Sequence, residues 1–254
     1  MPKMEYRNAT LKEREEFYRN EFDAGKLTQM EFRPQLYAVD IGSKTGITKF
    51  PEKKVMLIFL PPGLSPEELR KRLIHYLPEG VYYDRNIYKN VREFYEKKNF
   101  KRYWEDENYK GQQLCFDVDV ENIRDADHNN KEDYTAAVKE AAREALKLAG
   151  ILRKEHGFSR ISFVYSGRGF HVKVHDKGTE KLSFKERTAI NDALKGLPID
   201  RWVSGGYSKL MRLPFSLHGV VSRIPTILKE DELEGFDSST DERVIPGFLK
   251  KKQK

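Results

Sequence analysis

The sequence predicts a mixed α/β or α+β fold, in which helices flank a sheet that is not wholly parallel. Strand-like and helix-like segments are mixed along the 254 residues, enough for one large domain or two small ones. Two strand candidates, 161–165 and 170–174, are joined by Ser-Gly-Arg-Gly, which is typical of an antiparallel hairpin. Aromatic residues make up 12% of the chain, which indicates a folded core although 34% of the residues are charged.

Several helices have clear start or stop signals. Capping boxes open at Thr10, Ser65 and Ser183, and each is followed three residues later by a glutamate. The longest helix is expected to begin after Asp133 as its N-cap and to end near residue 156, where Gly157 follows. The strand candidates lie at 55–59, 114–120, 161–165, 170–174 and 209–213.

Composition limits the classes of function. The formal net charge of +7 gives mild support for a polyanionic partner such as nucleic acid. No apolar run approaches the ~20 residues that a membrane span needs, and the N-terminal residues have no apolar signal region, so a cytoplasmic protein is expected. Cys115 is the only cysteine, which excludes a disulfide framework and a cysteine-rich zinc site within one chain.

Two aspartates alternate with apolar residues in the strand candidate 114–120. Phe116 and Val118 point to one face, whereas Asp117 and Asp119 point to the other face, about 7 Å apart. Neighbouring carboxylates repel each other unless a cation neutralises them, and such hard oxygen ligands suit Mg²⁺ or Mn²⁺. A half-exposed strand with two solvated acids explains the same pattern equally well.

The turn of the predicted hairpin has the composition of a phosphate-binding loop. Gly167 and Gly169 would let backbone N–H groups approach a ligand closely. Ser166, Arg168 and His171 add a hydroxyl, a forked cation and a ring donor, which together suit a triphosphate. An ordinary glycine-containing turn is the alternative interpretation.

A third segment supplies one more acid and two basic groups. Asp200 precedes the run Arg212-Leu-Pro-Phe-Ser-Leu-His218. Judged alone, Asp200 is explained as a buried cap, Arg212 as a surface cation and His218 as a core histidine. The case for function therefore depends on the three segments together.

Together these segments resemble the catalytic small subunit of archaeal and eukaryotic primases, and the wider archaeo-eukaryotic primase superfamily. The resemblance lies within about residues 80–220 and is carried by Phe-Asp117-Val-Asp119, by Ser166-Gly-Arg168-Gly-Phe-His171, and by Asp200 followed by Arg212-Leu-Pro-Phe-Ser-Leu-His218. Val81-Tyr-Tyr83 is similar to a nucleotide-pocket segment of archaeal members. The resemblance implies a single catalytic domain at 1–248, with a mixed sheet, an RRM-like half and flanking helices, followed by a basic tail at 249–254.

The resemblance also implies a site. Asp117, Asp119 and Asp200 would bind two divalent ions, Mg²⁺ or Mn²⁺. The residues expected to hold the incoming nucleotide are Ser166, Gly167, Arg168, Gly169, His171, Arg212, His218 and Tyr83. The chain lacks the Cys/His zinc knuckle that many small primase subunits carry after the Asp-x-Asp strand, so no such zinc site is expected.

The implied activity is template-directed synthesis of RNA or DNA primers from nucleoside triphosphates. Single-stranded DNA is the expected template, a primase large subunit or a helicase is the expected protein partner, and no membrane association is expected. The alternatives are an end-joining-type repair polymerase of the same superfamily, a non-catalytic nucleic-acid-binding subunit, and a metal-dependent phosphatase or nuclease. The basic, aromatic stretch 97–104 offers a template surface, although a solvated charged helix explains it better.

Overall fold

The computed structural model describes residues 5–251. The strands are β1 (Tyr37–Asp40), β2 (Leu57–Phe59), β3 (Gly80–Asp84), β4 (Asn86–Tyr88), β5 (Tyr109–Gln112), β6 (Cys115–Asp119), β7 (Ile161–Tyr165), β8 (Gly169–Val174), β9 (Leu210–Arg212) and β10 (Thr226–Leu228). The α-helices are α1 (Leu11–Asn20), α2 (Pro66–Tyr76), α3 (Val91–Lys97), α4 (Val120–Ile123), α5 (Lys131–His156), α6 (Phe184–Ala193), α7 (Arg201–Ser204), α8 (Glu230–Leu233) and α9 (Gly247–Lys251).

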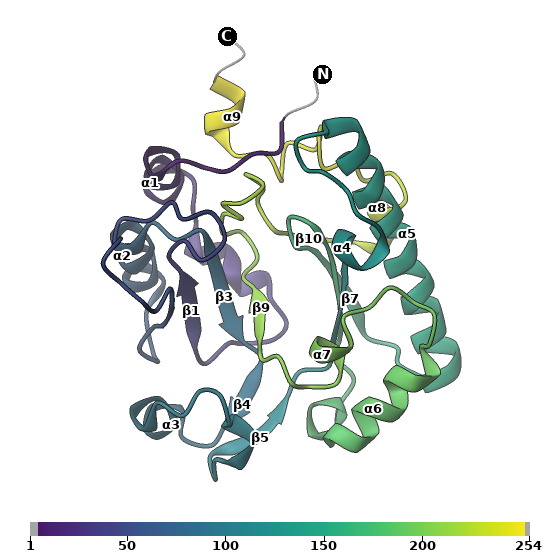
Figure 1. The fold of residues 1–254 in the computed structure, drawn as a ribbon. Coiled ribbons are helices and arrows are strands. Elements are labelled where there is room, and N and C mark those ends of the chain that lie inside the picture. The colour runs from purple at the N-terminus through teal and green to yellow at the C-terminus, as the bar shows by residue number, and fades with distance from the viewer. Residues whose placement is uncertain (1–4, 252–254) are drawn as a thin grey trace.

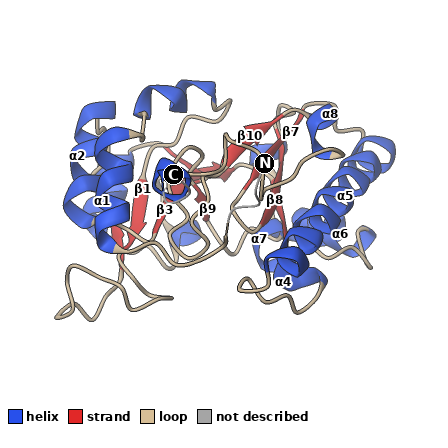
Figure 2. Cartoon of the chain, turned by 90° about the horizontal axis from the view of Figure 1, so that it is seen from above, coloured by secondary structure: helices blue, strands red, loops and turns tan. Residues whose placement is uncertain are grey.

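Two four-stranded sheets lie between two groups of helices. The strand order is β2-β1-β3-β9 in the first sheet and β10-β7-β8-β6 in the second, and all neighbouring strands in both are antiparallel. Helices α1 and α2 flank the first sheet, whereas α5, α6 and α8 flank the second (Figure 1 and Figure 2). The predicted fold class, a mixture of helices with a sheet that is not wholly parallel, is therefore confirmed.

Three strands of the second sheet have a connectivity that also occurs in RRM-like folds. The chain runs from β6 through α5 to β7 and returns in β8, and β8 pairs with both β6 and β7. Strands β6 and β7 are therefore parallel to each other with β8 between them, which is a split β-α-β unit. At the other edge of β6, the backbone N–H of Asp200 donates a hydrogen bond of 2.9 Å to the carbonyl oxygen of Asp117. The third predicted segment thus lies directly beside the strand that carries the two aspartates.

Local sequence signals set most of the helix ends. The capping boxes at Thr10, Ser65 and Ser183 all form, with both reciprocal hydrogen bonds present. Gly157 ends α5 in the left-handed region, with φ of 70°. None of the helices within residues 5–251 combines the length and the apolar character that a membrane crossing requires.

Two predicted boundaries are wrong. Asn130, not Asp133, caps α5: the Asn130 side chain accepts a hydrogen bond from the Asp133 backbone N–H, so the helix begins earlier. The basic tail predicted from residue 249 begins later, because α9 extends to Lys251 and buries Phe248 and Leu249. Burial of these two apolar side chains outweighs the tendency of a chain end to fray. The predicted tail residues 252–254 lie outside the described residues.

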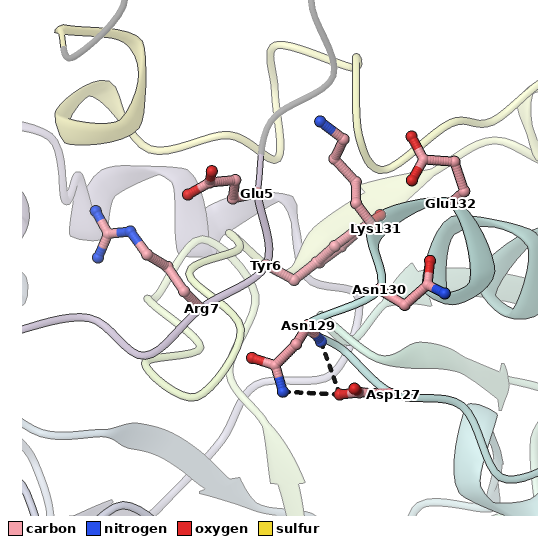
Figure 3. A pocket seen from close by; sticks show the side chains of 8 residues that line it. All are labelled: Glu5, Tyr6, Arg7, Asp127, Asn129, Asn130, Lys131 and Glu132. Carbon is pink, nitrogen blue, oxygen red and sulfur yellow. Dashed lines mark hydrogen bonds between the residues drawn. The ribbon is translucent and has the colours of Figure 1, made fainter.

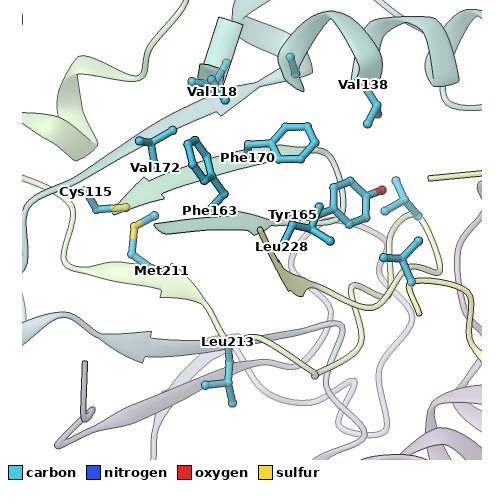
Figure 4. Packing of buried hydrophobic residues seen from close by; sticks show 14 of the residues in the cluster. Cys115, Val118, Val138, Phe163, Tyr165, Phe170, Val172, Met211, Leu213 and Leu228 are labelled. Carbon is cyan, nitrogen blue, oxygen red and sulfur yellow. The ribbon is translucent and has the colours of Figure 1, made fainter. Parts of the chain in front are cut away.

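The buried core fixes which way the residues of β6 point. Phe116 and Val118 are fully buried, and they pair across the sheet with Val172 and Phe170 of β8. Figure 4 shows Val118, Phe170 and Val172 close to Val138 of α5, and Phe116 belongs to the same hydrophobic cluster. Because side chains alternate along a strand, the aspartates between these apolar residues must face the opposite side.

Arg85, at the junction of β3 and β4, is hydrogen-bonded to three segments that are distant in the sequence. Its guanidinium is fully buried and donates hydrogen bonds to three backbone carbonyl groups. These belong to Gln113 just before β6, at 2.7 Å, to Ser208 just before β9, at 2.7 Å and 3.0 Å, and to Val203 of α7. One side chain therefore donates to buried carbonyl groups of three segments, of which that of Val203 also accepts from the backbone N–H of Gly206.

We expect Arg85→Met to lower the free energy of unfolding by about 2–3 kcal/mol, because the buried carbonyl groups lose their donors. Arg72→Met, in which an exposed arginine of α2 is replaced, should stay within about 0.5 kcal/mol of the parent protein. Urea unfolding of both variants measures the difference. Equal stability of the two variants would contradict a structural role for Arg85.

Candidate active site

A small pocket of about 110 Å³ opens above the two aspartates of β6. Seven predicted site residues line it, and they come from three segments that are distant in the sequence. These residues are Asp117, Asp119, Ser166, Arg168, His171, Arg212 and His218. The lining is completed by four residues that the sequence analysis did not single out, Tyr82, Val203, Leu210 and Met211.

Asp117 carries a carboxylate that the protein itself does not neutralise. Its side chain is 20% exposed, but Oδ1 is buried and accepts no hydrogen bond from the described residues. The nearest basic atom is Nε2 of His171, at 3.9 Å. Burial raises the pKa of Asp117 well above its usual value, and repulsion from Asp119 and Asp200 raises it further. A bound cation would remove this penalty.

Asp119 is better compensated than Asp117. Its Oδ1 accepts a hydrogen bond from the backbone N–H of Glu121 at 3.3 Å and lies 3.4 Å from Nη2 of Arg168. Burial raises the pKa of Asp119, while the charge of Arg168 opposes the shift. Glu121, which the sequence analysis did not single out, also forms an ion pair with Arg168. Arg168 therefore lies between two carboxylates at the mouth of the pocket.

Asp200 lies beside Asp117 of β6, and its carboxylate also caps helix α7. Its backbone is bonded to Asp117, and its Oδ1 accepts hydrogen bonds from the N–H groups of Trp202 and Val203, at 2.8 Å and 3.3 Å. It thus caps α7, as the structural interpretation of this residue anticipated, and it does not line the pocket.

The donors at this site fit a hard divalent cation. Within the described part of the chain, no three His, Cys, Asp or Glu side chains form a group ready to hold a metal ion. Asp117 and Asp119 provide two carboxylates, and the buried, unpartnered Oδ1 of Asp117 is available to a ligand. Mg²⁺ is commonly held by one or two carboxylates together with substrate phosphates, so this donor set suits an ion that arrives with a nucleotide.

The opposite wall of the pocket carries a fixed cation. The Arg212 guanidinium donates to Nε2 of His218 at 3.1 Å, and its Cζ lies 4.4 Å from the centre of the Tyr82 ring. Because arginine has no acceptor, Nε2 of His218 must be the acceptor, which assigns the ring proton to Nδ1. Burial, followed by the charges of Arg212 and Arg168, lowers the pKa of His218 well below its usual value.

His171 is also a neutral ring. It is buried in β8 opposite Asp117, and its Nδ1 has no hydrogen-bond partner among the described residues. Burial, followed by the charges of Lys173 and Arg212, lowers its pKa well below the usual value. Both histidines can therefore donate one hydrogen bond without adding a positive charge to the pocket.

The hairpin glycines are required by packing. Neither Gly167 nor Gly169 lines the pocket. A Cβ at Gly167, whose φ is 105°, would lie 2.7 Å from the His218 ring, and a Cβ at Gly169 would collide with the carbonyl oxygen of Val118. The Gly169 N–H donates to Oγ of Ser166 at 3.1 Å, which closes the turn. The role expected for these glycines at a ligand stays a prediction.

Tyr83 does not line the pocket, and its expected contact with the nucleotide stays a prediction. Its ring is fully buried and its hydroxyl donates to Oε1 of Gln113 at 3.0 Å. The neighbouring Tyr82 pairs with Arg212 across the β3–β9 ladder and faces the pocket instead. Successive residues of a strand point to opposite faces, so recognising β3 in the sequence would have selected one of the two tyrosines.

A larger hollow of about 700 Å³ lies between the N-terminal segment and the loop before α5 (Figure 3). It is lined by Glu5, Tyr6, Arg7, Asp127, Asn129, Asn130, Lys131 and Glu132, none of which the sequence motifs include. The residues of the predicted motifs therefore line the smaller pocket above β6 and not this hollow.

Comparison with known proteins supports the same family. No family model matches the chain. A protein of Archaeoglobus fulgidus, named as an uncharacterized DNA primase small subunit-like protein, is 36% identical over 263 residues, covering 96% of this chain and 91% of that protein. The DNA primase small subunit PriS of Pyrobaculum calidifontis is 30% identical over 175 residues, covering 66% of this chain and 48% of its own.

A second PriS and one solved structure are also similar. PriS of Pyrococcus horikoshii is 33% identical over 185 residues, covering 65% of this chain and 52% of its own, so the chain spans about half the length of these two PriS proteins. The polymerase domain of Mycobacterium tuberculosis ligase D in complex with DNA superposes with a TM-score of 0.46 and 14% identity, covering 95% of this chain and 86% of that domain. The extent of the Archaeoglobus match shows that the chain belongs to the family of DNA primase small subunit-like proteins.

Proposed function

We propose that this chain is a template-directed nucleotidyltransferase that synthesises RNA or DNA primers from nucleoside triphosphates. The observation that carries the proposal is the arrangement of charge in the pocket. A buried, unpartnered carboxylate oxygen of Asp117 lies beside Asp119, while Arg168 and Arg212 enter the same pocket. A nucleoside triphosphate with its divalent cation carries both charges that this pocket would bind. The cation would bind the aspartates, and the phosphates would bind the arginines.

Asp117 and Asp119 would hold the divalent ions, Mg²⁺ or Mn²⁺, and Asp200 beside them would complete the acidic set. Ions held there supply an activated attacking hydroxyl and neutralise charge on the triphosphate and the leaving pyrophosphate. In the proposed reaction, a 3′-hydroxyl would release its proton to solvent as its oxygen bonds to the α-phosphorus, the bond to the β-phosphate oxygen would break, and pyrophosphate would leave with the electron pair.

The other residues of the pocket would position the triphosphate. Arg212 is held between the Tyr82 ring and His218, so its donors are already oriented and little side-chain entropy is lost on binding. Arg168 would exchange part of its contact with Asp119 and Glu121 for phosphate oxygens. His171 and His218 would each donate one hydrogen bond, and the negative phosphates would raise the lowered pKa of both rings.

The alternatives predict different products. An end-joining-type repair polymerase extends an existing 3′ end, whereas a primase starts on single-stranded DNA without one. A phosphatase or nuclease would hydrolyse triphosphate or DNA without a template, and a non-catalytic subunit would only bind nucleic acid. Incubating the protein with single-stranded DNA, labelled nucleotides and Mg²⁺ or Mn²⁺, once without and once with a primer, separates all four, because a repair polymerase gives product only with the primer and a non-catalytic subunit gives none. Template-dependent product of more than one nucleotide is the result expected here.

We expect the double variant Asp117→Ala with Asp119→Ala to lower nucleotide incorporation by at least about 10²-fold, because the carboxylates that would hold the ions are gone. Asp125→Ala with Asp127→Ala is the matched control, since these two acids have the same spacing in an exposed loop. The control should retain full incorporation. Unchanged incorporation by the first variant would refute the catalytic assignment.

A second prediction concerns stability in the presence of a chelator. Asp117→Asn removes a buried charge that has no partner, so we expect it to raise the free energy of unfolding by about 1 kcal/mol. Adding Mg²⁺ or Mn²⁺ should raise the Tm of the parent protein but not that of the variant, because an ion bound only by the folded state stabilises it. Thermal unfolding with EDTA and with each ion measures both effects, and Asp125→Asn is the control. A parent Tm that does not respond to either ion would contradict the proposed ion site.

A further inference from the structure

Four aromatic side chains form a continuous array on the surface beside the pocket. The Trp202 and Tyr207 rings are 4.8 Å apart with an interplanar angle of 30°, and Tyr207 stacks on Phe184 at 5.2 Å and 24°. Trp104 meets the edge of Phe184 at 5.8 Å. Three segments that are distant in the sequence therefore contribute to one surface, called here the aromatic array.

The rings of the array are exposed to an extent that core packing does not explain. Trp202 is 64% exposed, Tyr207 42% and Trp104 39%, and they are the exposed large aromatic side chains of the described residues. Exposed aromatic surface of this size is unfavourable in water unless a ligand covers it, and grouped rings are typical of a binding surface.

The backbone around the array is shaped to hold these rings. Gly206 has φ of 96°, and a Cβ there would lie 3.0 Å from the Phe184 ring. A Cβ at Gly205 would lie 3.2 Å from the Tyr207 ring. The Tyr207 N–H donates to the carbonyl oxygen of Trp202 at 3.0 Å, which fixes the two rings relative to each other. The two glycines thus provide the close approach that the stacked rings need.

The array begins at the wall of the pocket. Asp200 caps α7, Trp202 is exposed on that helix, and the next residue, Val203, lines the pocket. Exposed cations adjoin the rings in the sequence: Lys185 follows Phe184, and Arg201, which also forms an ion pair with Asp192 at 3.6 Å, precedes Trp202. Stacked rings with neighbouring positive charges are the features with which proteins bind single-stranded nucleic acid, because every base offers a face for stacking and the backbone is anionic.

We propose that the aromatic array is a base-stacking platform for single-stranded DNA, with Trp202 and Tyr207 as its main contacts. The proposal deepens the function proposed above, since it rests on that function for the role of the bound strand as template. Stacking tolerates any base, which a template surface requires. The array also differs from the surface expected at 97–104. There Phe100 and Tyr103 pack in a second apolar cluster with Phe94, and only Trp104 belongs to the array.

The chain provides its own reporter for a test. The sequence contains two tryptophans, and both belong to the array. Titration of the whole protein with oligo(dT) should quench tryptophan emission, and duplex DNA of the same length should quench it less. Trp202→Ala with Tyr207→Ala should raise the Kd for labelled oligo(dT), measured by anisotropy, by about tenfold or more. Trp202→Phe with Tyr207→Phe keeps the rings and should bind within about threefold of the parent.

Val55→Ala with Leu57→Ala is the matched control, because it removes exposed apolar surface from the start of β2 and the segment just before it and should leave the Kd unchanged. The slope of log Kd against log salt should be the same in the alanine variant of the array, since the rings neutralise no phosphate. An unchanged Kd in that variant, or unchanged tryptophan emission at saturating oligo(dT), would overturn the proposal. The second result would point to a protein partner for the array.

The outcome also separates this proposal from the proposed function. If the array variant loses oligo(dT) binding but the parent incorporates no nucleotide, the platform stands and the polymerase function fails. If the parent incorporates nucleotides and the array variant binds and incorporates as well as the parent, the platform fails and the polymerase function stands. Circular dichroism and thermal unfolding of each variant verify that the fold is retained.

Discussion

The site depends on one constraint, the alternation of side chains along β6. Phe116 and Val118 are buried against β8 and α5, and this forces Asp117 and Asp119 onto the other face, side by side. Burying an apolar side chain of this kind contributes about 1.5–3 kcal/mol, whereas a buried polar group without a partner costs about 1–3 kcal/mol. Two apolar residues together therefore outweigh the penalty at Asp117. Packing of the core can therefore hold the Asp117 carboxylate in a buried position without a hydrogen-bond partner, and this position would be preorganised for a cation.

The arginines of the pocket belong to other elements than the aspartates of β6. Their charges therefore neutralise those of the aspartates only in part. Arg212 belongs to β9 in the first sheet and is held by Tyr82 and His218, so it has no ion pair with the aspartates of β6 in the second sheet. Among the cations of residues 5–251, Arg168 on the hairpin next to β6 is the one that forms an ion pair with Asp119. Such a separation of acids and cations supports the proposal that the ligand carries both a metal ion and phosphates.

The features that could be predicted from the sequence are those set by local interactions. The capping boxes, the hairpin and the two faces of β6 each depend on residues within a few positions of one another, and the structure has all of them. The sequence prediction names Tyr83, whereas Tyr82 lines the pocket; without a strand predicted at β3, the face of the sheet to which each tyrosine points is unknown from the sequence. The packing role of Gly167 against His218 could not be predicted either, because it requires contacts between distant segments. The aromatic array cannot be predicted from the sequence for the same reason, because Trp104, Phe184 and Trp202 come close together only in the folded chain.

Asp200 connects the pocket to the aromatic array. Helix α7 has four residues, too few to be stable without external bonds, so its position depends on the contacts of its ends. The Asp200 N–H is bonded to the Asp117 carbonyl oxygen, and the Asp200 carboxylate holds the N–H groups of Trp202 and Val203. Both cap bonds use Oδ1, so they leave Oδ2 for another ligand. The backbone that sets the distance between Asp200 and the aspartate pair is therefore the same backbone that orients Trp202 at the start of the array.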